Sequence, residues 1–196
     1  KEQVSLRRIF QIYQWLCKPS TLRRVAQLKL REGFCFFGAP GDEADLFHAN
    51  TVEIIDRDID TICKKGDLLI CALKLDLIGI LDFEKERFLW SWGPGDLDRP
   101  HQPALLQNGN IMIFDNGRSR GYSRIIELEP FTKNIVWEYK SDPPNKFYTA
   151  IRGSSQRLPN GNTLITESDK GHVFEVTRGG QIVWEFYNPK IRNKDK

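Results

Sequence analysis

From Asp45 onward, apolar and polar residues alternate with a period of two, which is the pattern of half-buried β-strands. The pattern is clearest in residues 101–128. There an Asn108-Gly109 turn signal precedes an apolar run, a polar loop rich in glycine and arginine, and a second apolar run. Similar units lie on both sides, and their first apolar runs begin at Gly66-Asp67-Leu68, Gly109-Asn110-Ile111 and Gly161-Asn162-Thr163. The chain is therefore a repeat protein.

Each unit also contains a tryptophan in a later apolar run, and Trp90, Trp137 and Trp184 are successively 47 residues apart. A period of this length with several short strands is typical of β-propeller blades. We therefore predict an all-β fold in which residues 45–189 form a partial β-propeller of about three four-stranded blades. Because the tryptophans recur at one strand position, we expect them to pack between neighbouring blades.

Three blades are too few for a closed ring, since propellers use four to eight. The alternatives are a fragment of a longer gene product, an assembly of several chains, or a degenerate extra blade within residues 1–60. The fragment is the favoured interpretation. The terminal blades would then expose apolar faces, so we predict that the isolated chain self-associates or dissolves poorly. Residues 190–196 form a charged tail.

Residues 1–44 differ from the repeats. Apolar residues within 3–29 have helical spacing, and basic residues outnumber acidic ones. This N-terminal helical segment is either a basic amphipathic anchor or partner helix, or a linker helix packed on the body. The linker is the favoured interpretation.

Composition excludes several kinds of function. The net charge is only +3, from 29 basic and 26 acidic residues, which argues against a nucleic-acid binder. Nothing in the chain suggests a membrane span. The four cysteines form no CxxC pair, so we predict no zinc site, and no cofactor of any kind is indicated.

The three histidines suggest a site. His48 and His101 precede or begin the first strand of their units, and such segments open on the face that also holds the loops between second and third strands. An overlay of the third strands through Asp82, Glu127 and Glu175 puts Gly79, Arg124 and His172 in register. His172 would then lie on that same face, with Arg118 and Arg120 from the polar loop. Imidazoles and guanidiniums with few carboxylates suit an anion such as sulfate, phosphate or carboxylate.

Several stretches resemble the arylsulfotransferase family, the aryl-sulfate sulfotransferases that use no nucleotide donor. They are FHANTVE, PHQPALLQNGNIMIFDNGRSRGYSRIIELEP, IVWEY and QRLPNGNTLITESDKGHVFEV, and the similarity covers about residues 45–189. The His-x-Asn, Asn-Gly-Asn and Asp-Asn-Gly elements occur in the family's order. The resemblance implies a six-bladed propeller, periplasmic or secreted, although no secretory signal pattern is visible in this chain.

The resemblance also implies a reaction, in which a sulfuryl group moves from a phenolic sulfate ester to a phenol acceptor through a sulfohistidine. Its partners would be these small molecules, without metal or nucleotide. The catalytic residues would be His48, His101, Arg120 and His172, with His172 as the nucleophile, His101 as the second choice and Arg120 as a two-pronged clamp on sulfate oxygens. The predicted substrate-binding residues are Asn50, Asn116, Arg118, Arg124 and Arg152. The alternative is a non-catalytic propeller that binds a protein or an anionic ligand at its channel mouth.

Overall fold

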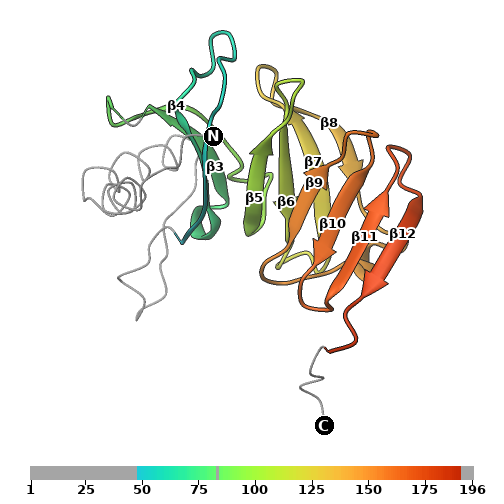
Figure 1. Cartoon of the computed structure of the whole chain (residues 1–196). Helices are drawn as coiled ribbons and strands as arrows, with labels where there is room; N and C mark the ends of the chain where they lie inside the picture. The colour runs from blue at the N-terminus through green and yellow to red at the C-terminus, as the bar shows by residue number, and fades with distance from the viewer. Residues whose placement is uncertain (1–47, 83, 191–196) are drawn as a thin grey trace, which may run out of the picture. The chain divides into compact units, whose positions relative to one another are not determined.

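The computed structural model describes residues 48–82 and 84–190, and the description below concerns the compact unit that begins at Ala49. The predicted helical segment within residues 1–44 lies outside the described residues. The described chain is all-β and contains three four-stranded antiparallel sheets, which we call blades 1, 2 and 3 (Figure 1). Within the described ranges, no helix is long and apolar enough to cross a membrane.

Each blade is a meander of consecutive strands, as expected for sheets built from short hairpins. Blade 1 contains β1 (Ala49–Ile54), β2 (Leu68–Ala72), β3 (Leu77–Asp82) and β4 (Arg87–Trp92), with a 3-10 turn at Leu73–Leu75. Blade 2 contains β5 (Pro100–Leu105), β6 (Ile111–Asp115), β7 (Arg124–Glu129) and β8 (Asn134–Tyr139), followed by a 3-10 turn at Pro144–Lys146. Blade 3 contains β9 (Ser154–Arg157), β10 (Thr163–Glu167), β11 (His172–Val176) and β12 (Ile182–Tyr187). The predicted three four-stranded blades are confirmed.

The register of the third strands corrects the overlay made from the sequence. In β3, β7 and β11 the pairing shifts directly after one residue, which lies opposite the repeated tryptophan: Ile80 opposite Trp90, Glu127 opposite Trp137 and Glu175 opposite Trp184. The counterpart of Glu127 and Glu175 in blade 1 is therefore Ile80, two residues before Asp82. Accordingly, Leu77 rather than Gly79 corresponds to Arg124 and His172.

Asp82 has a different counterpart, Glu129, because both carboxylates accept hydrogen bonds from the hairpin turn that follows them. Asp82 accepts the backbone N–H of Lys85, and Glu129 accepts that of Thr132. Acceptance of these bonds holds the pKa of both carboxyls below their usual value. The acidic residue at this place is thus a turn-forming residue.

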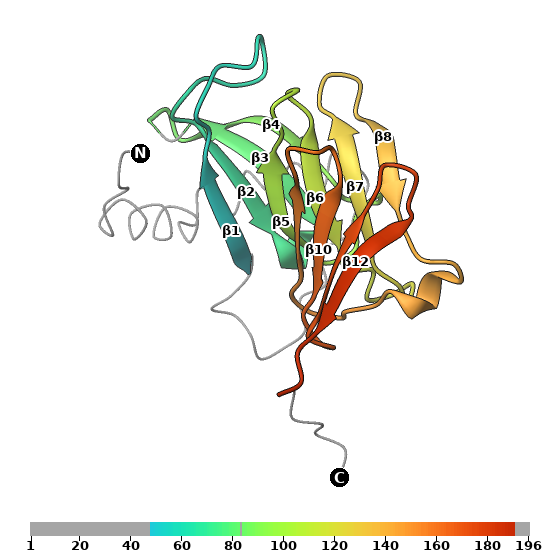
Figure 2. The same ribbon diagram turned by 45° about the vertical axis from the view of Figure 1, so that its right-hand side comes forward.

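The blades pack face to face, with one face of each blade against the opposite face of the next (Figure 2). Between blades 1 and 2, the buried cluster includes Leu69, Cys71, Ile78, Ile80 and Trp92 on one side and Ile111, Ile113, Ile126 and Leu128 on the other. Between blades 2 and 3, it includes Met112, Phe114, Ile125 and Tyr139 against Phe147, Ile165, Phe174 and Val176. The period-two alternation therefore separates the two faces of each blade.

The repeated tryptophans connect adjacent blades, as predicted. Trp90 Nε1 donates to the carbonyl of Pro130 at 2.9 Å, and Trp137 Nε1 donates to the carbonyl of Arg178 at 2.8 Å. In each case the acceptor lies in the turn between the third and fourth strands of the next blade. Trp184 of blade 3, in contrast, is 51% exposed.

The Asn-Gly-Asn elements hold a carboxylate. Asn108 and Asn110 both donate side-chain hydrogen bonds to Oε1 of Glu127, at 3.0 and 2.8 Å. Asn160 and Asn162 hold Oε1 of Glu175 in the same way, at 3.0 and 2.7 Å. Gly109 between the first two asparagines has a φ of +87°, a backbone conformation that favours glycine.

Glu127 carries a second set of contacts. Its Oε2 accepts hydrogen bonds from Arg157 Nη2 and Arg178 Nη1, both of blade 3, at 2.8 and 2.5 Å. Both guanidiniums also lie over the Trp137 ring, at 4.5 and 5.7 Å from its centroid. Burial alone would raise the pKa of Glu127, but hydrogen bonds from Asn110, Asn108 and Arg178 lower it below its usual value. This ion-paired glutamate therefore joins blades 2 and 3.

Candidate functional site

Three residues just before or near the start of the first strands of blades 2 and 3 have strained backbone. Arg99, Gln102 and Arg152 have φ values of 57°, 42° and 73°, which non-glycine residues adopt at a cost. The pairing of β5 with β6 also shifts between His101 and Ala104. Strained residues and irregular strand pairings concentrate at functional sites, so these segments of blades 2 and 3 are the first place to look for one.

A short hydrogen bond holds His101 at the start of β5. Its Nδ1 lies 2.7 Å from Oδ1 of Asn116, a fully buried residue in the loop after β6. The amide orientation of Asn116 is set by its other contacts, because Nδ2 donates to the carbonyls of Thr149 and Arg152 at 2.8 and 2.5 Å. Its Oδ1 must then accept the hydrogen bond from His101. Nδ1 of His101 therefore carries the proton, and Nε2 carries the lone pair in the neutral ring.

The same network reaches all three blades. Asn50 of β1 donates through Nδ2 to the carbonyl of Pro100 at 3.0 Å, the residue before His101. Asn116 connects onward to the carbonyl of Arg152, which precedes β9. The structure thus brings together four of the predicted site residues, Asn50, His101, Asn116 and Arg152. We call this the His101–Asn116 site.

Arg120 and Arg124 share one carboxylate. Arg120 Nη2 and Arg124 Nε each lie 2.8 Å from Oδ2 of Asp115, whose side chain is fully buried at the end of β6. Burial raises the pKa of Asp115, and Arg120, the backbone N–H of Asp98 and Arg124 oppose this rise. Since Asp115 is the neighbour of Asn116 in the chain, its carboxylate holds both guanidiniums close to the His101–Asn116 site.

The contacts of Arg120 and Arg124 show how tightly this pair is held. Arg124 also donates to Glu138 and to the carbonyl of Asp96, at 3.0 and 2.7 Å. Arg120 also lies over the ring of Tyr122, 5.1 Å from its centroid. Gly117 leaves room for this guanidinium, because a Cβ at that position would lie 2.7 Å from Arg120 Nη2. The same Cβ would lie 1.9 Å from the carbonyl oxygen of Tyr122, so a larger residue would have to move the loop backbone as well as Arg120.

Arg118 and Arg152 are the exposed arginines of this region. Within the part of the chain that the structure describes, neither guanidinium has a hydrogen bond or ion pair. Arg118 follows Asn116 by two residues, and the Arg152 carbonyl contacts Asn116 directly. Both side chains therefore start from backbone beside the His101–Asn116 site, and solvated guanidiniums are suited to bind an anion.

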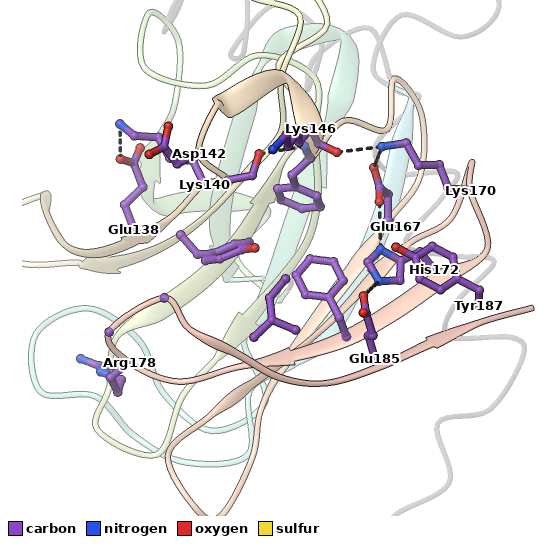
Figure 3. Close-up of a pocket in the computed structure, with 17 residues that line it drawn as sticks. Glu138, Lys140, Asp142, Lys146, Glu167, Lys170, His172, Arg178, Glu185 and Tyr187 are labelled. Atoms are coloured by element: carbon purple, nitrogen blue, oxygen red, sulfur yellow. Dashed lines mark hydrogen bonds and ion pairs between the residues drawn. The ribbon is translucent and has the colours of Figure 1, made fainter.

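His172 lies at the same end of its strand but in a different environment. It begins β11, the third strand of blade 3, and is buried between two carboxylates (Figure 3). Its Nδ1 is 3.2 Å from Glu167, and its Nε2 is 3.1 Å from Glu185. Its ring stacks on Tyr187 with centroids 4.0 Å apart. A groove of about 580 Å³ runs past it, lined by residues of β8, β11, β12 and the adjoining loops.

These contacts disfavour His172 as the nucleophile. Each ring nitrogen of His172 lies within hydrogen-bond distance of a carboxylate. In one arrangement both ring nitrogens carry a proton and donate to Glu167 and Glu185. In the other, one ring N–H donates and the second nitrogen accepts from a protonated carboxyl. Either arrangement occupies both nitrogens, whereas attack on sulfur requires a lone pair. The groups in contact with the ring nitrogens are the carboxylates of Glu167 and Glu185, and Glu167 is itself paired with Lys170 at 2.6 Å. His172 lies on β11, the third strand of its blade, whereas His101 lies on β5, the first strand of blade 2, and convergence of the two on one channel mouth stays a prediction.

His48 directly precedes β1, is exposed, and has a φ of 45°. The pairing of first with second strands places Ala49 opposite Ala72 and Pro100 opposite Asp115, each at the end of its second strand. Counting along β1 and β5, Asn50 corresponds to His101, and His48 corresponds to Arg99. The His-x-Asn element therefore contributes its asparagine at the position of His101. Among the described residues, no group of His, Cys, Asp and Glu has the arrangement of a metal site.

Together, these features describe an all-β blade-repeat protein with a candidate site in which an imidazole and an amide meet where first strands begin. The family model described as Arylsulfotransferase (ASST) matches residues 14–189, and the chain belongs to this family. A search of curated protein sequences finds no match.

Solved structures of low sequence identity share the fold. A protein of unknown function from Bacteroides caccae is 16% identical with a TM-score of 0.50, over 77% of this chain and 49% of that protein. Selenomethionine-substituted virginiamycin B lyase from Staphylococcus aureus is 17% identical with a TM-score of 0.50, over 75% and 43%. A catalytically inactive variant of that lyase with quinupristin gives 16% identity and a TM-score of 0.50, over 79% and 45%. The chain thus spans less than half the length of these β-propeller-like proteins.

Proposed function

We propose that this chain supplies part of an arylsulfotransferase site, and that His101 is the residue that accepts the sulfuryl group. The observation that carries the proposal is the hydrogen bond between His101 and Asn116. Because the other contacts of Asn116 orient its amide, this bond defines which ring nitrogen holds the proton and which holds the lone pair. Membership of the arylsulfotransferase family supports the substrate class, a phenolic sulfate ester.

In the proposed reaction, Nε2 of His101 attacks the sulfur of the ester. The N–S bond forms as the bond between sulfur and the phenolic oxygen breaks, and the electron pair of that bond leaves on the phenolate. The imidazolium formed keeps its proton on Nδ1, where the Asn116 carbonyl oxygen stabilises it. An acceptor phenol then attacks the same sulfur, the N–S bond breaks, and neutral His101 is restored. The phenolate takes up one proton and the acceptor loses one, so the cycle is balanced.

Cations stabilise this transfer because the non-bridging oxygens of the sulfuryl group carry negative charge throughout. Arg118 and Arg152 are the proposed ligands for these oxygens, since both are exposed beside the His101–Asn116 site. Arg120 and Arg124 would act indirectly, by fixing the Asp115 carboxylate and with it the loop that carries Asn116. The predicted direct clamp by Arg120 would require it to reach past this carboxylate. The family resemblance offers His48 or His172 as the group that exchanges protons with the phenols.

The test measures release of coloured nitrophenolate from 4-nitrophenyl sulfate in the presence of phenol, for this chain and for the intact product of its gene. His101→Gln should lower turnover by at least about a hundredfold. Removing a single electrostatic donor typically costs about that much, and loss of the nucleophile should cost no less. It should also abolish a sulfuryl adduct that mass spectrometry locates on the peptide containing His101. External imidazole should partly restore turnover in His101→Gly.

His172→Gln is the comparison variant, since it removes a different imidazole and leaves the His101–Asn116 hydrogen bond in place. We expect it to change turnover less than His101→Gln does. If His101→Gln retains full turnover, or if the adduct lies on His172, the assignment is wrong. If the intact product binds the ester and never turns it over, the protein is a non-catalytic anion-binding propeller instead.

A further inference from the structure

The outward face of blade 3 has the same arrangement of residues as the face of blade 2 that packs against blade 3. Register matches the two faces residue by residue, because Glu175 opposite Trp184 corresponds to Glu127 opposite Trp137. The corresponding residues in blade 3 are Leu164, Thr166, Val173, Glu175, Trp184 and Phe186. Trp184 and Phe186 of this set are 51% and 50% exposed. A large aromatic patch that lies exposed on a sheet indicates a binding surface.

The Glu175 carboxylate on this face has hydrogen-bond donors for one of its two oxygens. Asn160 and Asn162 hold Oε1 of Glu175, as Asn108 and Asn110 hold Oε1 of Glu127. Within the described residues, however, no cation contacts Glu175, whereas Oε2 of Glu127 accepts from two arginines of the next blade. The Trp184 indole likewise corresponds to an indole that donates to the next blade.

We propose that this outward face binds a further four-stranded blade that brings two arginines onto Glu175 and a turn carbonyl onto the Trp184 indole. One arginine would end the first strand of that blade, as Arg157 does in blade 3, and the other would lie in its turn between third and fourth strands, as Arg178 does. The two guanidiniums would then flank Trp184 as they flank Trp137. This inference is independent of the proposed chemistry at His101.

Blade 1 of a second copy does not have this chemistry. Pairing with the second strand places Ile54 of β1 at the position of Arg157, so no arginine would reach Glu175 from there. Two copies therefore do not close a ring through these faces, and the partner is a blade of different sequence.

The test is a chain extended by one repeat, in which a second copy of residues 143–189 follows Pro189. This copy is 47 residues long, the spacing of the tryptophans, so it presents Arg157 and Arg178 at the required positions. In the copy alone, Trp184→Glu and Phe186→Lys make its own outer face polar, as terminal repeats require. Hydrogen exchange of β12 and the emission of Trp184, taken as the difference from a Trp184→Phe chain, report docking.

We expect amide exchange in β12 to slow by about tenfold or more, and Trp184 emission to move to shorter wavelength. Replacing the copy's two arginines with leucine should remove most of the protection, since Glu175 would be buried without a counter-charge. Adding Glu175→Ile in blade 3 should restore it. Leucine in the copy with isoleucine at position 175 reproduces the interface of blades 1 and 2. There Ile80 corresponds to Glu175 and Leu105 to Arg157, and both lie in one apolar cluster.

Two results would overturn the proposal. One is a copy that stays sensitive to protease, or that folds while β12 and Trp184 keep their original exposure. The other is equal protection with arginine and with leucine opposite Glu175, because the partner would then need no cations. The arginine-bearing extended chain could fail to fold. In that case the variant with leucine in the copy and Glu175→Ile in blade 3 tests whether the apolar residues of the face dock. Unchanged Trp184 emission in that variant refutes docking on this face.

Discussion

Replacing Glu127 with glutamine removes one charge from the interface of blades 2 and 3 at nearly constant volume. Glu127 is 1% exposed and binds two arginines, of which Arg157 has a 14% exposed side chain and Arg178 a 52% exposed one. Breaking a buried ion pair from one side costs about 3–5 kcal/mol. The half-exposed Arg178 can be rehydrated and contributes at most about 1 kcal/mol.

The expected loss in the free energy of unfolding at neutral pH is therefore about 3 kcal/mol, near the low end, since glutamine still accepts hydrogen bonds. For a chain of this size, that corresponds to roughly 6–12 °C in Tm. Glu175→Gln is the matched control, because Glu175 holds the same asparagine pair but contacts no cation among the described residues. It should change Tm much less. Thermal and urea unfolding followed by circular dichroism measures both variants.

The pH dependence provides a second check. The folded-state pKa of Glu127 is lowered, so its contribution is complete above its unfolded pKa, near 4.5, and is lost as pH falls through the folded pKa. The Tm values of wild type and Glu127→Gln should therefore converge as pH falls through this lowered folded-state pKa. Equal effects of Glu127→Gln and Glu175→Gln at pH 7, or a difference that persists in acid, would refute the reasoning.

Three further predictions concern packing, thiols and the site. Gly153→Ala should cost about 3 kcal/mol or more, because the new Cβ would lie 2.4 Å from the Phe114 ring at a φ of +115°, and urea unfolding measures this. Burial raises the pKa of Cys63 to about 11 and that of Cys71 further, so neither thiol should react with a disulfide reagent at pH 8 until the chain is denatured. Arg120→Lys should lower turnover of the intact gene product about tenfold or more, because lysine cannot keep the guanidinium's contacts, and unchanged turnover would remove Arg120 from the site.

Period-two alternation and the tryptophan spacing were enough to predict three four-stranded blades. They could not define the register in blade 1, because blade 2 has two acidic residues, Glu127 and Glu129, on one strand. The overlay took Asp82 as the counterpart of the first, whereas its bonds to the turn match the second. Only strand pairing shows that Ile80 is opposite Trp90. The local signals are alike because Glu127 and Glu129 lie two residues apart on the same strand, β7.

The site was predicted in part. The sequence identified Asn50, His101, Asn116 and Arg152 individually, and the structure connects them through backbone carbonyls and one imidazole. Asn116 was predicted only as a ligand-binding residue, and its role in orienting an imidazole depends on acceptors 33 and 36 residues away. No local motif encodes such contacts.

For His172, the sequence predicted the position along the strand but not the surroundings of the side chain. Its strand end was predicted correctly, but the end of a strand does not reveal how far that strand lies from the first strand of its sheet. The two carboxylates that bind it, Glu167 and Glu185, lie 5 and 13 residues away, on the strands adjacent to β11. That pattern is visible in the sequence as acidic residues that face one histidine across two hairpins, and it would have suggested a structural ion pair.

The different contacts at the two blade interfaces also affect the order in which blades can assemble. Blades 1 and 2 meet at this position through Ile80 and Leu105, and blades 2 and 3 meet through Glu127 and Arg157. A misfolded chain that put blade 3 directly against blade 1 would bury Arg157 beside Ile80, and a buried charge without a partner is strongly unfavourable. Repeat proteins are prone to pairing the wrong neighbours during folding, because their units are so similar. The charged residues at the interface of blades 2 and 3 thereby disfavour direct pairing of blade 3 with the apolar face of blade 1.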